Sequence, residues 1–326
     1  NVYYQTIGKL YEEVNQLFFS ESNPLQSPVI QLGFWPGGDR DGNPFVTSEI
    51  TWKVARLLRT SIIKNYYKHL KIIQRRLTFK HVTQPLKELS DLLYEHMFNE
   101  DGPITIEQIK DKLQETRAIL IEKHNGIFLD ILDDFITRVN IFGLHFASLD
   151  IRQDSRIHQK VINQIVEKYT GIDLNDLSET EKIELLTNPS FTVKAEDFEE
   201  EIVVDTIKNV YQLKDIQEQN GELGVNRYII SNSETIFDVL NVYALFKFCG
   251  YKDEDIRFDI MPLFETIRGL DGAEATMNKL YNLPIYAEHL NRRKNRQSIM
   301  LGFSDGTKDG GYIKANWEIY RTKEIL

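Results

Sequence analysis

The stretch PVIQLGFWPGGDRDGNP, residues 28–44, joins a short apolar run to a cluster of glycines and charged residues. An apolar run of this length that ends in turn residues is typical of a buried β-strand. The same pattern recurs at 144–152, 226–231, 256–264 and 298–304. We therefore predict five strands, each of which leads into polar or glycine residues.

The segments between these runs have the periodicity of amphipathic helices. A long helix is expected from about 48 to 76, after a cap at Thr47 or Ser48 and with Glu49 in its first turn. Further helices are expected near 105–123, 126–142, 157–169, 234–249, 271–282 and 309–325.

Alternating strands and helices predict an α/β fold with a parallel sheet. Charged, polar and glycine residues that could form a functional site follow four of the predicted strands. This arrangement is typical of a barrel or an open doubly wound sheet. We favour a partial (β/α)8 TIM-type barrel with many additional helices. Residues 1–326 are expected to form one segment of that domain, with a helical and polar excursion around 157–220.

The net charge of the chain indicates which classes of binding partner are disfavoured. The chain has 49 acidic and 39 basic residues and a formal charge of −10, which disfavours a nucleic acid or an anionic membrane as partner. Hydrophobic residues make up 41% of the 326, enough for a sizeable core. With no run of about 20 apolar residues, we expect a soluble, cytoplasmic protein.

Two carboxylates close apolar strands in this interpretation. Glu265 ends the fourth strand and Asp305 ends the fifth, so both are expected at the same mouth of the sheet. Two such oxygens suit Mg²⁺ or Mn²⁺. Each carboxylate could instead cap a helix or pair with a neighbouring Lys or Arg. Histidine and cysteine spacing gives no support to a zinc site.

Three cations could meet an anion near those carboxylates. Arg152, flanked by aspartates, could bind a carboxylate or phosphate in bidentate fashion or belong to an internal ion-pair network. Lys308 lies in a glycine-bearing turn before a helix, where it could bind an anion or be merely solvated. Arg40, between two aspartates, could act in catalysis or pin its loop.

Several long motifs resemble those of phosphoenolpyruvate carboxylases. FWPGGDRDGNPFVT at 34–47 is similar to the family pattern FGSWxGGDRDGNPxVT, and LDIRQDSRIH at 149–158 is similar to LDIRQESxxH. The resemblance continues through three further motifs in the family's order: YIISNSETIFDVLNV at 228–242, MPLFETIRGLDGAEATM at 261–277 and MLGFSDGTKDGGYIKANWEIYRTKE at 300–324.

This resemblance implies a (β/α)8 barrel that needs a divalent metal and carboxylates phosphoenolpyruvate with bicarbonate, giving oxaloacetate and phosphate. It also implies a homotetrameric parent protein. Motif position assigns metal binding to Glu265 and Asp305, and binding of the substrate's phosphoryl or carboxylate end to Arg152. The remaining implied site residues are Lys308 beside the metal-ligand loop, Trp35 and Leu263 around the methylene carbon, and Arg40 in the substrate-binding loop.

The sequence also departs from the family pattern. Gly306 replaces the second serine of SDSxKD, and the family's TAHPTE and FHGRGGSxGRGG motifs do not occur. We therefore expect an internal piece of a carboxylase with little or no activity alone. Two alternatives stay open: another metal-dependent barrel acting on phosphoenolpyruvate or pyruvate, and a non-catalytic assembly or regulatory module derived from the carboxylase.

Overall fold

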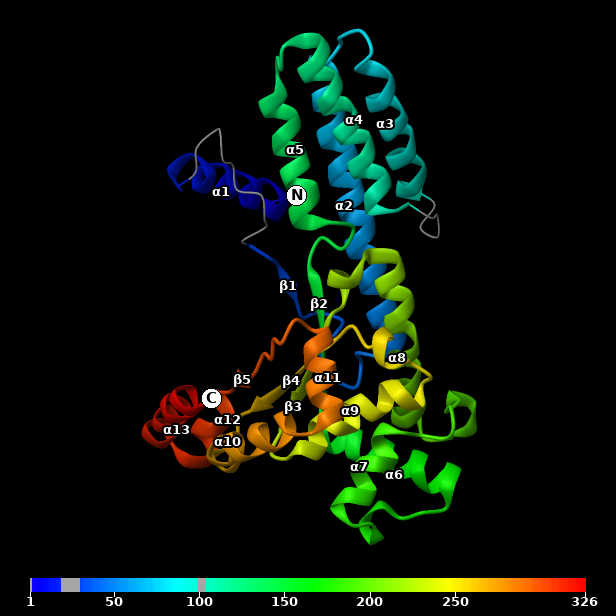
Figure 1. Ribbon diagram of the computed structural model, residues 1–326, viewed down its shortest axis with the longest axis vertical. Coiled ribbons are helices and arrows are strands. Elements are labelled where there is room, and N and C mark those ends of the chain that lie inside the picture. Colours follow the sequence, from blue (N-terminus) through cyan, green and yellow to red (C-terminus); the bar gives the residue numbers. More distant parts are fainter. Residues whose placement is uncertain (1, 19–29, 99–103) are drawn as a thin grey trace. The chain divides into compact units, whose positions relative to one another are not determined.

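A computed structural model describes residues 2–18, 30–98 and 104–326 (Figure 1). The chain divides into two compact units, each made of segments that are separate in sequence. The first comprises Asn1–Phe34, Lys53–Ser148 and Ile216–Gly224. The second comprises Trp35–Trp52, Leu149–Asp215 and Val225–Leu326.

The first unit is built mainly from helices. They are α1 (Val2–Phe18), α2 (Ser48–Arg76, in this unit from Lys53), α3 (Thr83–Phe98), α4 (Ile106–His124) and α5 (Leu129–Phe142). Their apolar faces meet in a core rich in aromatic rings, where Tyr4 packs edge-on against Tyr66 at 6.1 Å between ring centroids. The Tyr66 hydroxyl donates to the Gly143 carbonyl oxygen at 2.7 Å, so this buried phenol is satisfied.

The strands form one parallel sheet in the order β1-β2-β3-β4-β5, which is also their order along the chain. They are β1 (Gly33–Phe34), β2 (Ser148–Asp154), β3 (Arg227–Ser231), β4 (Asp259–Phe264) and β5 (Met300–Leu301). In register, Asp150 pairs with Arg227, and Arg227 pairs with Asp259. A curled parallel sheet with helical connections in chain order is part of a (β/α)8 barrel (Figure 1).

The second unit connects its strands by helices. They are α6 (Ser155–Thr170), α7 (Glu179–Thr187), α8 (Glu201–Asn220, in this unit as far as Asp215), α9 (Ile236–Phe248), α10 (Ile267–Tyr281), α11 (Pro284–Arg292), α12 (Ser304–Gly310) and α13 (Tyr312–Ile325). Local caps explain two of the starts: Asp154 accepts from the Arg156 N–H to begin α6, and Thr266 accepts from the Gly269 N–H to begin α10.

The prediction of an α/β fold with a partial barrel is confirmed, and β2, β3 and β4 lie where strands were predicted. The first and fifth predicted strands are shorter than expected, with two residues each in β1 and β5; residues 28 and 29 of the first lie outside the described part. The helix predicted at 309–325 begins only at Tyr312, because Gly311 has a φ of 80° that ends α12. Helices α3, α11 and α12 were not predicted, and α7 and α8 lie in the region for which only a helical and polar excursion was expected.

No helix within the described ranges combines the length and apolar character needed to cross a membrane.

Candidate functional site

The loop that follows β1 is attached directly to β2. The Arg40 N–H donates to the Arg152 carbonyl oxygen at 2.8 Å, and the Arg152 N–H donates to the Gly38 carbonyl oxygen at 2.9 Å. A Cβ atom on Gly38 would lie 2.0 Å from the carbonyl oxygen of Asp150, a distance that no real side chain tolerates. Glycine at this position therefore permits the close backbone approach that places the charged loop beside β2.

Arg152 is held by this loop. Its Nη2 lies 2.7 Å from Asp41 Oδ2, its Nε lies 3.7 Å from Asp39 Oδ1, and its guanidinium stands 5.4 Å from the centre of the Trp35 ring. The Nε is buried and has no hydrogen-bond partner in the described part of the chain. The guanidinium is thus fixed in position while retaining donor capacity for an anion.

Glu265 follows the last residue of β4 and is 9% exposed. Its Oε1 accepts a hydrogen bond from the Asn232 N–H at 2.8 Å. Asn232 itself has a φ of 56°, and its carbonyl oxygen accepts from the Ser155 hydroxyl at 2.8 Å. A strained residue just after β3 is therefore anchored to α6 and orients the carboxylate of Glu265.

The pKa of Glu265 is raised above its usual value. Burial is the main cause, and the negative charges of Asp305 and Asp41 raise it further. The Asn232 N–H and the positive charge of Arg152 oppose the increase. On balance the ionised form of Glu265 is therefore disfavoured, although Arg152 stabilises it in part.

Asp305 and Lys308 lie on α12. Their side chains form an ion pair of 2.6 Å on the solvent side, and this hydrogen bond to Asp305 raises the pKa of Lys308. Asp305 was predicted to close a strand and Lys308 to lie in a turn, but β5 ends at Leu301 and both residues are helical. The backbone still passes close to Glu265, because a Cβ on Gly302 would lie 2.4 Å from the Glu265 Cβ.

Arg40 is buried and faces away from solvent. Its Nη2 lies 2.5 Å from Oδ2 of Asp205 on α8, and Asp205 Oδ1 also accepts from the N–H and hydroxyl of Ser48. Although burial opposes it, these contacts with Arg40 and Ser48 lower the pKa of Asp205. Arg40 thus makes the contact expected of a residue that pins its loop.

The two predicted apolar site residues have different surroundings. Leu263 is buried in β4, whereas the Trp35 ring is partly exposed. The Trp35 side chain hydrogen-bonds the carboxyl group of Asp150, which also pairs with Arg227 at 2.8 Å. Burial nevertheless raises the pKa of Asp150. Trp35 is therefore positioned by Asp150, whose carboxylate is already paired with Arg227.

Three contributors to the site were not singled out from the sequence. Asp41 was visible within GGDRDGNP, but nothing local indicated that it pairs with Arg152. Asn232 contributes through its backbone, which no side-chain motif reports. Asp205 lies 165 residues from its partner Arg40, so no local pattern indicated that the two residues pair.

Within residues 2–18, 30–98 and 104–326, no group of three or more Asp, Glu, His or Cys side chains gathers into a metal cluster. The negative charge of Asp305 contributes to the raised pKa of Glu265.

Comparison with known proteins gives a consistent result. The family model described as phosphoenolpyruvate carboxylase matches residues 1–104 and 104–326. A phosphoenolpyruvate carboxylase of Thermosynechococcus vestitus is 30% identical over 396 aligned positions, covering 100% of this chain and 39% of the relative. One from Nitrosomonas europaea is 29% identical, covering 96% of this chain and 39% of the relative.

The carboxylase of a Synechococcus species is 30% identical and covers 100% of this chain and 37% of its own length. The chain thus spans less than two fifths of the length of the curated relatives that it matches. The family model extends over both compact units and over every motif singled out from the sequence. The chain belongs to the phosphoenolpyruvate carboxylase family.

Proposed function

We propose that the protein containing this chain carboxylates phosphoenolpyruvate with bicarbonate, giving oxaloacetate and phosphate. Family membership supports this proposal. A local arrangement supports it as well, because Glu265 is buried and the charges of Asp305, Asp41 and Arg152 affect its pKa. This reaction develops negative charge on oxygen atoms during phosphoryl transfer and in the enolate that follows. Fixed cations and metal ligands at one site are suited to stabilise that charge.

The family uses a divalent metal, and in this proposal Glu265 and Asp305 hold Mg²⁺ or Mn²⁺. Their oxygen donors suit these ions. Burial is the main cause of the raised pKa of Glu265, and the smaller contribution from the charges of Asp305 and Asp41 is repulsion that a cation would offset. When bound, the metal supplies positive charge that stabilises developing negative charge on oxygen. Asp305 would exchange its exposed Lys308 partner for this role, at little cost because surface ion pairs are weak.

The other proposed roles use the remaining site residues. Arg152 would bind the phosphoryl or carboxylate group through its free donor capacity, and Lys308 would add charge beside the metal-ligand helix. Trp35 and Leu263 would form an apolar wall around the methylene carbon, which keeps water from protonating the enolate. Arg40 would act on substrate binding by holding its loop in place.

At the level of the whole protein, we propose that residues 1–326 form one central segment of the barrel domain of a cytoplasmic homotetramer. The chain alone is expected to form no oxaloacetate, because the TAHPTE and FHGRGGSxGRGG motifs occur nowhere in it. A non-catalytic module derived from the carboxylase is the second candidate, and the metal site distinguishes the two.

The test is Mn²⁺ binding to the chain by calorimetry, with a parallel oxaloacetate assay. We expect saturable binding that weakens by about tenfold or more in Glu265→Ala and in Asp305→Ala. Glu274→Ala, which removes an exposed carboxylate on α10, should bind as the parent does. Binding that is unchanged in both site variants would refute the ligand assignment, and oxaloacetate formation by the chain alone would refute the expected inactivity.

A further inference from the structure

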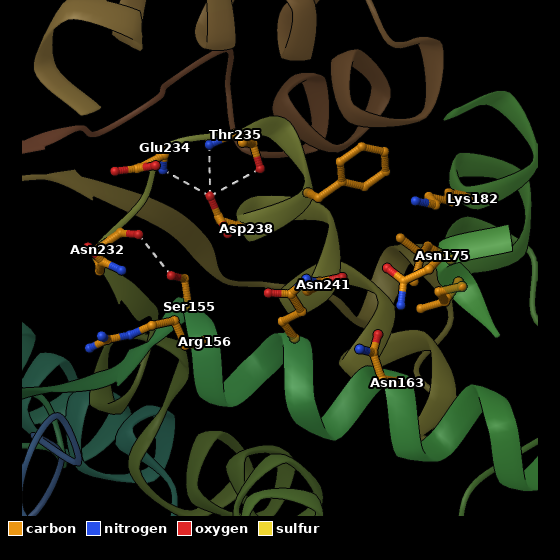
Figure 2. A pocket seen from close by; sticks show the side chains of 14 residues that line it. Ser155, Arg156, Asn163, Asn175, Lys182, Asn232, Glu234, Thr235, Asp238 and Asn241 are labelled. Carbon is orange, nitrogen blue, oxygen red and sulfur yellow. Dashed lines mark hydrogen bonds between the residues drawn. The ribbon is translucent and has the colours of Figure 1, made fainter. Parts of the chain in front are cut away.

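A cavity of about 370 Å³ opens in the second unit, between α6, α9 and the segment that carries α7 and the 3-10 helix η1 (Leu174–Asp176) (Figure 2). Its volume lies within the range of small-molecule sites. None of the predicted site residues lines it.

Asn241 is the most informative residue of its lining. It lies on α9, a helix whose neighbouring residues are buried and mostly apolar, and it is only 6% exposed. Its side-chain amide lines the cavity and makes no hydrogen bond within the described part of the chain. The amide is therefore available to water or to a ligand in the cavity, and polar groups in such places are usually paired with one or the other.

Two further amides line the same space from other elements. Asn163 comes from α6 and Asn175 from η1, and Figure 2 labels both together with Asn241. Neither side chain hydrogen-bonds to another described residue, although the backbone N–H of Asn175 donates to Asp173. Each amide offers two donor hydrogens and one acceptor oxygen. The cavity therefore presents both kinds of hydrogen-bonding group from three directions.

The charged residues of the lining are mostly engaged elsewhere. Arg156 pairs with Asp154 at 2.5 Å, and Glu234 accepts from the Thr266 hydroxyl at 3.1 Å. Asp238 accepts from the N–H groups of Glu234 and Thr235, the two residues that precede α9 (Figure 2).

Lys182 differs from these residues, since it has no ion pair within the described chain and lies 5.9 Å from the centre of the Phe237 ring. The remaining wall is apolar and includes Phe237, Leu174 and Leu186. One free cation, three amides and an apolar wall thus line the same cavity.

We propose that this cavity binds a small polyhydroxylated compound, either neutral or with one anionic group. A hydroxyl group both donates and accepts, so several hydroxyls match three amides that also do both. The carbon skeleton of such a compound would pack against the Phe237 ring and the two leucines, and Lys182 would pair with a single anionic group. The inference does not depend on the proposed carboxylase activity.

The test uses the whole chain and three probes in saturation-transfer NMR and calorimetry. Myo-inositol represents a neutral polyol, D-gluconate a polyol with one carboxylate, and hexanoate a carboxylate of similar length without hydroxyls. We expect saturable binding of at least one polyol probe and weaker binding of hexanoate. Lys182→Met should weaken only gluconate, which separates the neutral ligand from the anionic one.

Asn241→Leu removes the buried amide while keeping a side chain of similar size. We expect it to weaken polyol binding by about tenfold or more. Asn65→Leu, which replaces an amide on α2 in the first unit, is the matched control and should bind as the parent does. If Asn241→Leu does not fold, the half-buried Asn163→Leu provides the same comparison.

Three outcomes would overturn the proposal. One is a folded chain that binds neither polyol, which would mean that water alone fills the cavity. The second is polyol binding that survives in both Asn241→Leu and Asn163→Leu. The third is hexanoate binding as tight as that of gluconate, because the amides would then not recognise hydroxyl groups.

Discussion

At the scale of single residues, Glu265 combines burial with conflicting charges. Asn232 and Arg152 stabilise its ionised form, whereas burial, Asp305 and Asp41 favour the protonated form. The balance raises the pKa, so ionised Glu265 destabilises the folded chain until positive charge is added. In the proposed metal site, a bound cation would offset this cost.

Glu265→Gln should therefore raise the free energy of unfolding at about pH 7.5. A carboxyl group whose pKa is raised on folding contributes stability that is fully present below its unfolded pKa and is lost as the pH rises through its folded pKa. Glutamine keeps the acceptor for the Asn232 N–H but carries no charge. The advantage of the variant should thus disappear by about pH 4.

Urea denaturation at the two pH values measures this difference. Glu274→Gln on α10 is the control and should show no comparable dependence on pH. A Glu265→Gln variant that is less stable than the parent at the higher pH would contradict the assignment of the raised pKa.

At the scale of elements, the junction between the loop after β1 and strand β2 determines where Arg152 lies. Two backbone hydrogen bonds join the loop to the strand: the Arg40 N–H donates to the Arg152 carbonyl oxygen, and the Arg152 N–H donates to the Gly38 carbonyl oxygen. Gly38 is required for close approach, whereas Gly42 is required for its φ of 66° and has open space around it. The two glycines of one motif therefore serve different physical needs.

Gly38→Ala should lower the free energy of unfolding by about 1–3 kcal/mol, because its Cβ would overlap the carbonyl oxygen of Asp150. Gly42→Ala should cost only about 1 kcal/mol, the penalty for a left-handed backbone conformation. Denaturant titration of both variants measures their free energies of unfolding. Equal losses of stability in the two variants would show that the loop can move away from β2 without penalty.

At the scale of the whole chain, α13 carries an exposed apolar face. Ile313 is 84% exposed and Trp317 59%, and Tyr320 continues the same face at helical spacing. The short β5 also lies at one edge of the sheet in the described strand order. Exposed apolar patches and sheet edges both promote association between molecules.

We therefore expect the chain to self-associate as its concentration rises, as measured by light scattering. Trp317→Lys should shift the onset of association to higher concentration by removing the centre of the apolar face. Ile72→Lys replaces an exposed apolar residue on α2, outside α13, and should leave association unchanged. A parent chain that stays monomeric at high concentration would disprove the expectation.

Local sequence was sufficient to determine the α/β class, the positions of the three longer strands and several helices, because periodicity and caps act over a few residues. The same local information identified the motifs that the family comparison confirms. Prediction from local sequence failed where residues typical of turns occur inside helices. The turn expected around Lys308 is a short helix. Helix α3 contains Pro85, which is tolerated because it lies in the first helical turn.

The tertiary structure alone decided which groups meet. Three contacts join residues that are 33 to 165 positions apart. They are the pairs Arg152–Asp41 and Arg40–Asp205 and the hydrogen bond from the Asn232 N–H to Glu265. The gathering of Asn163, Asn175 and Asn241 around one cavity likewise brings together residues of three separate elements. Such contacts depend on how strands and helices pack, and no pattern within a single element encodes the distance between side chains on different elements.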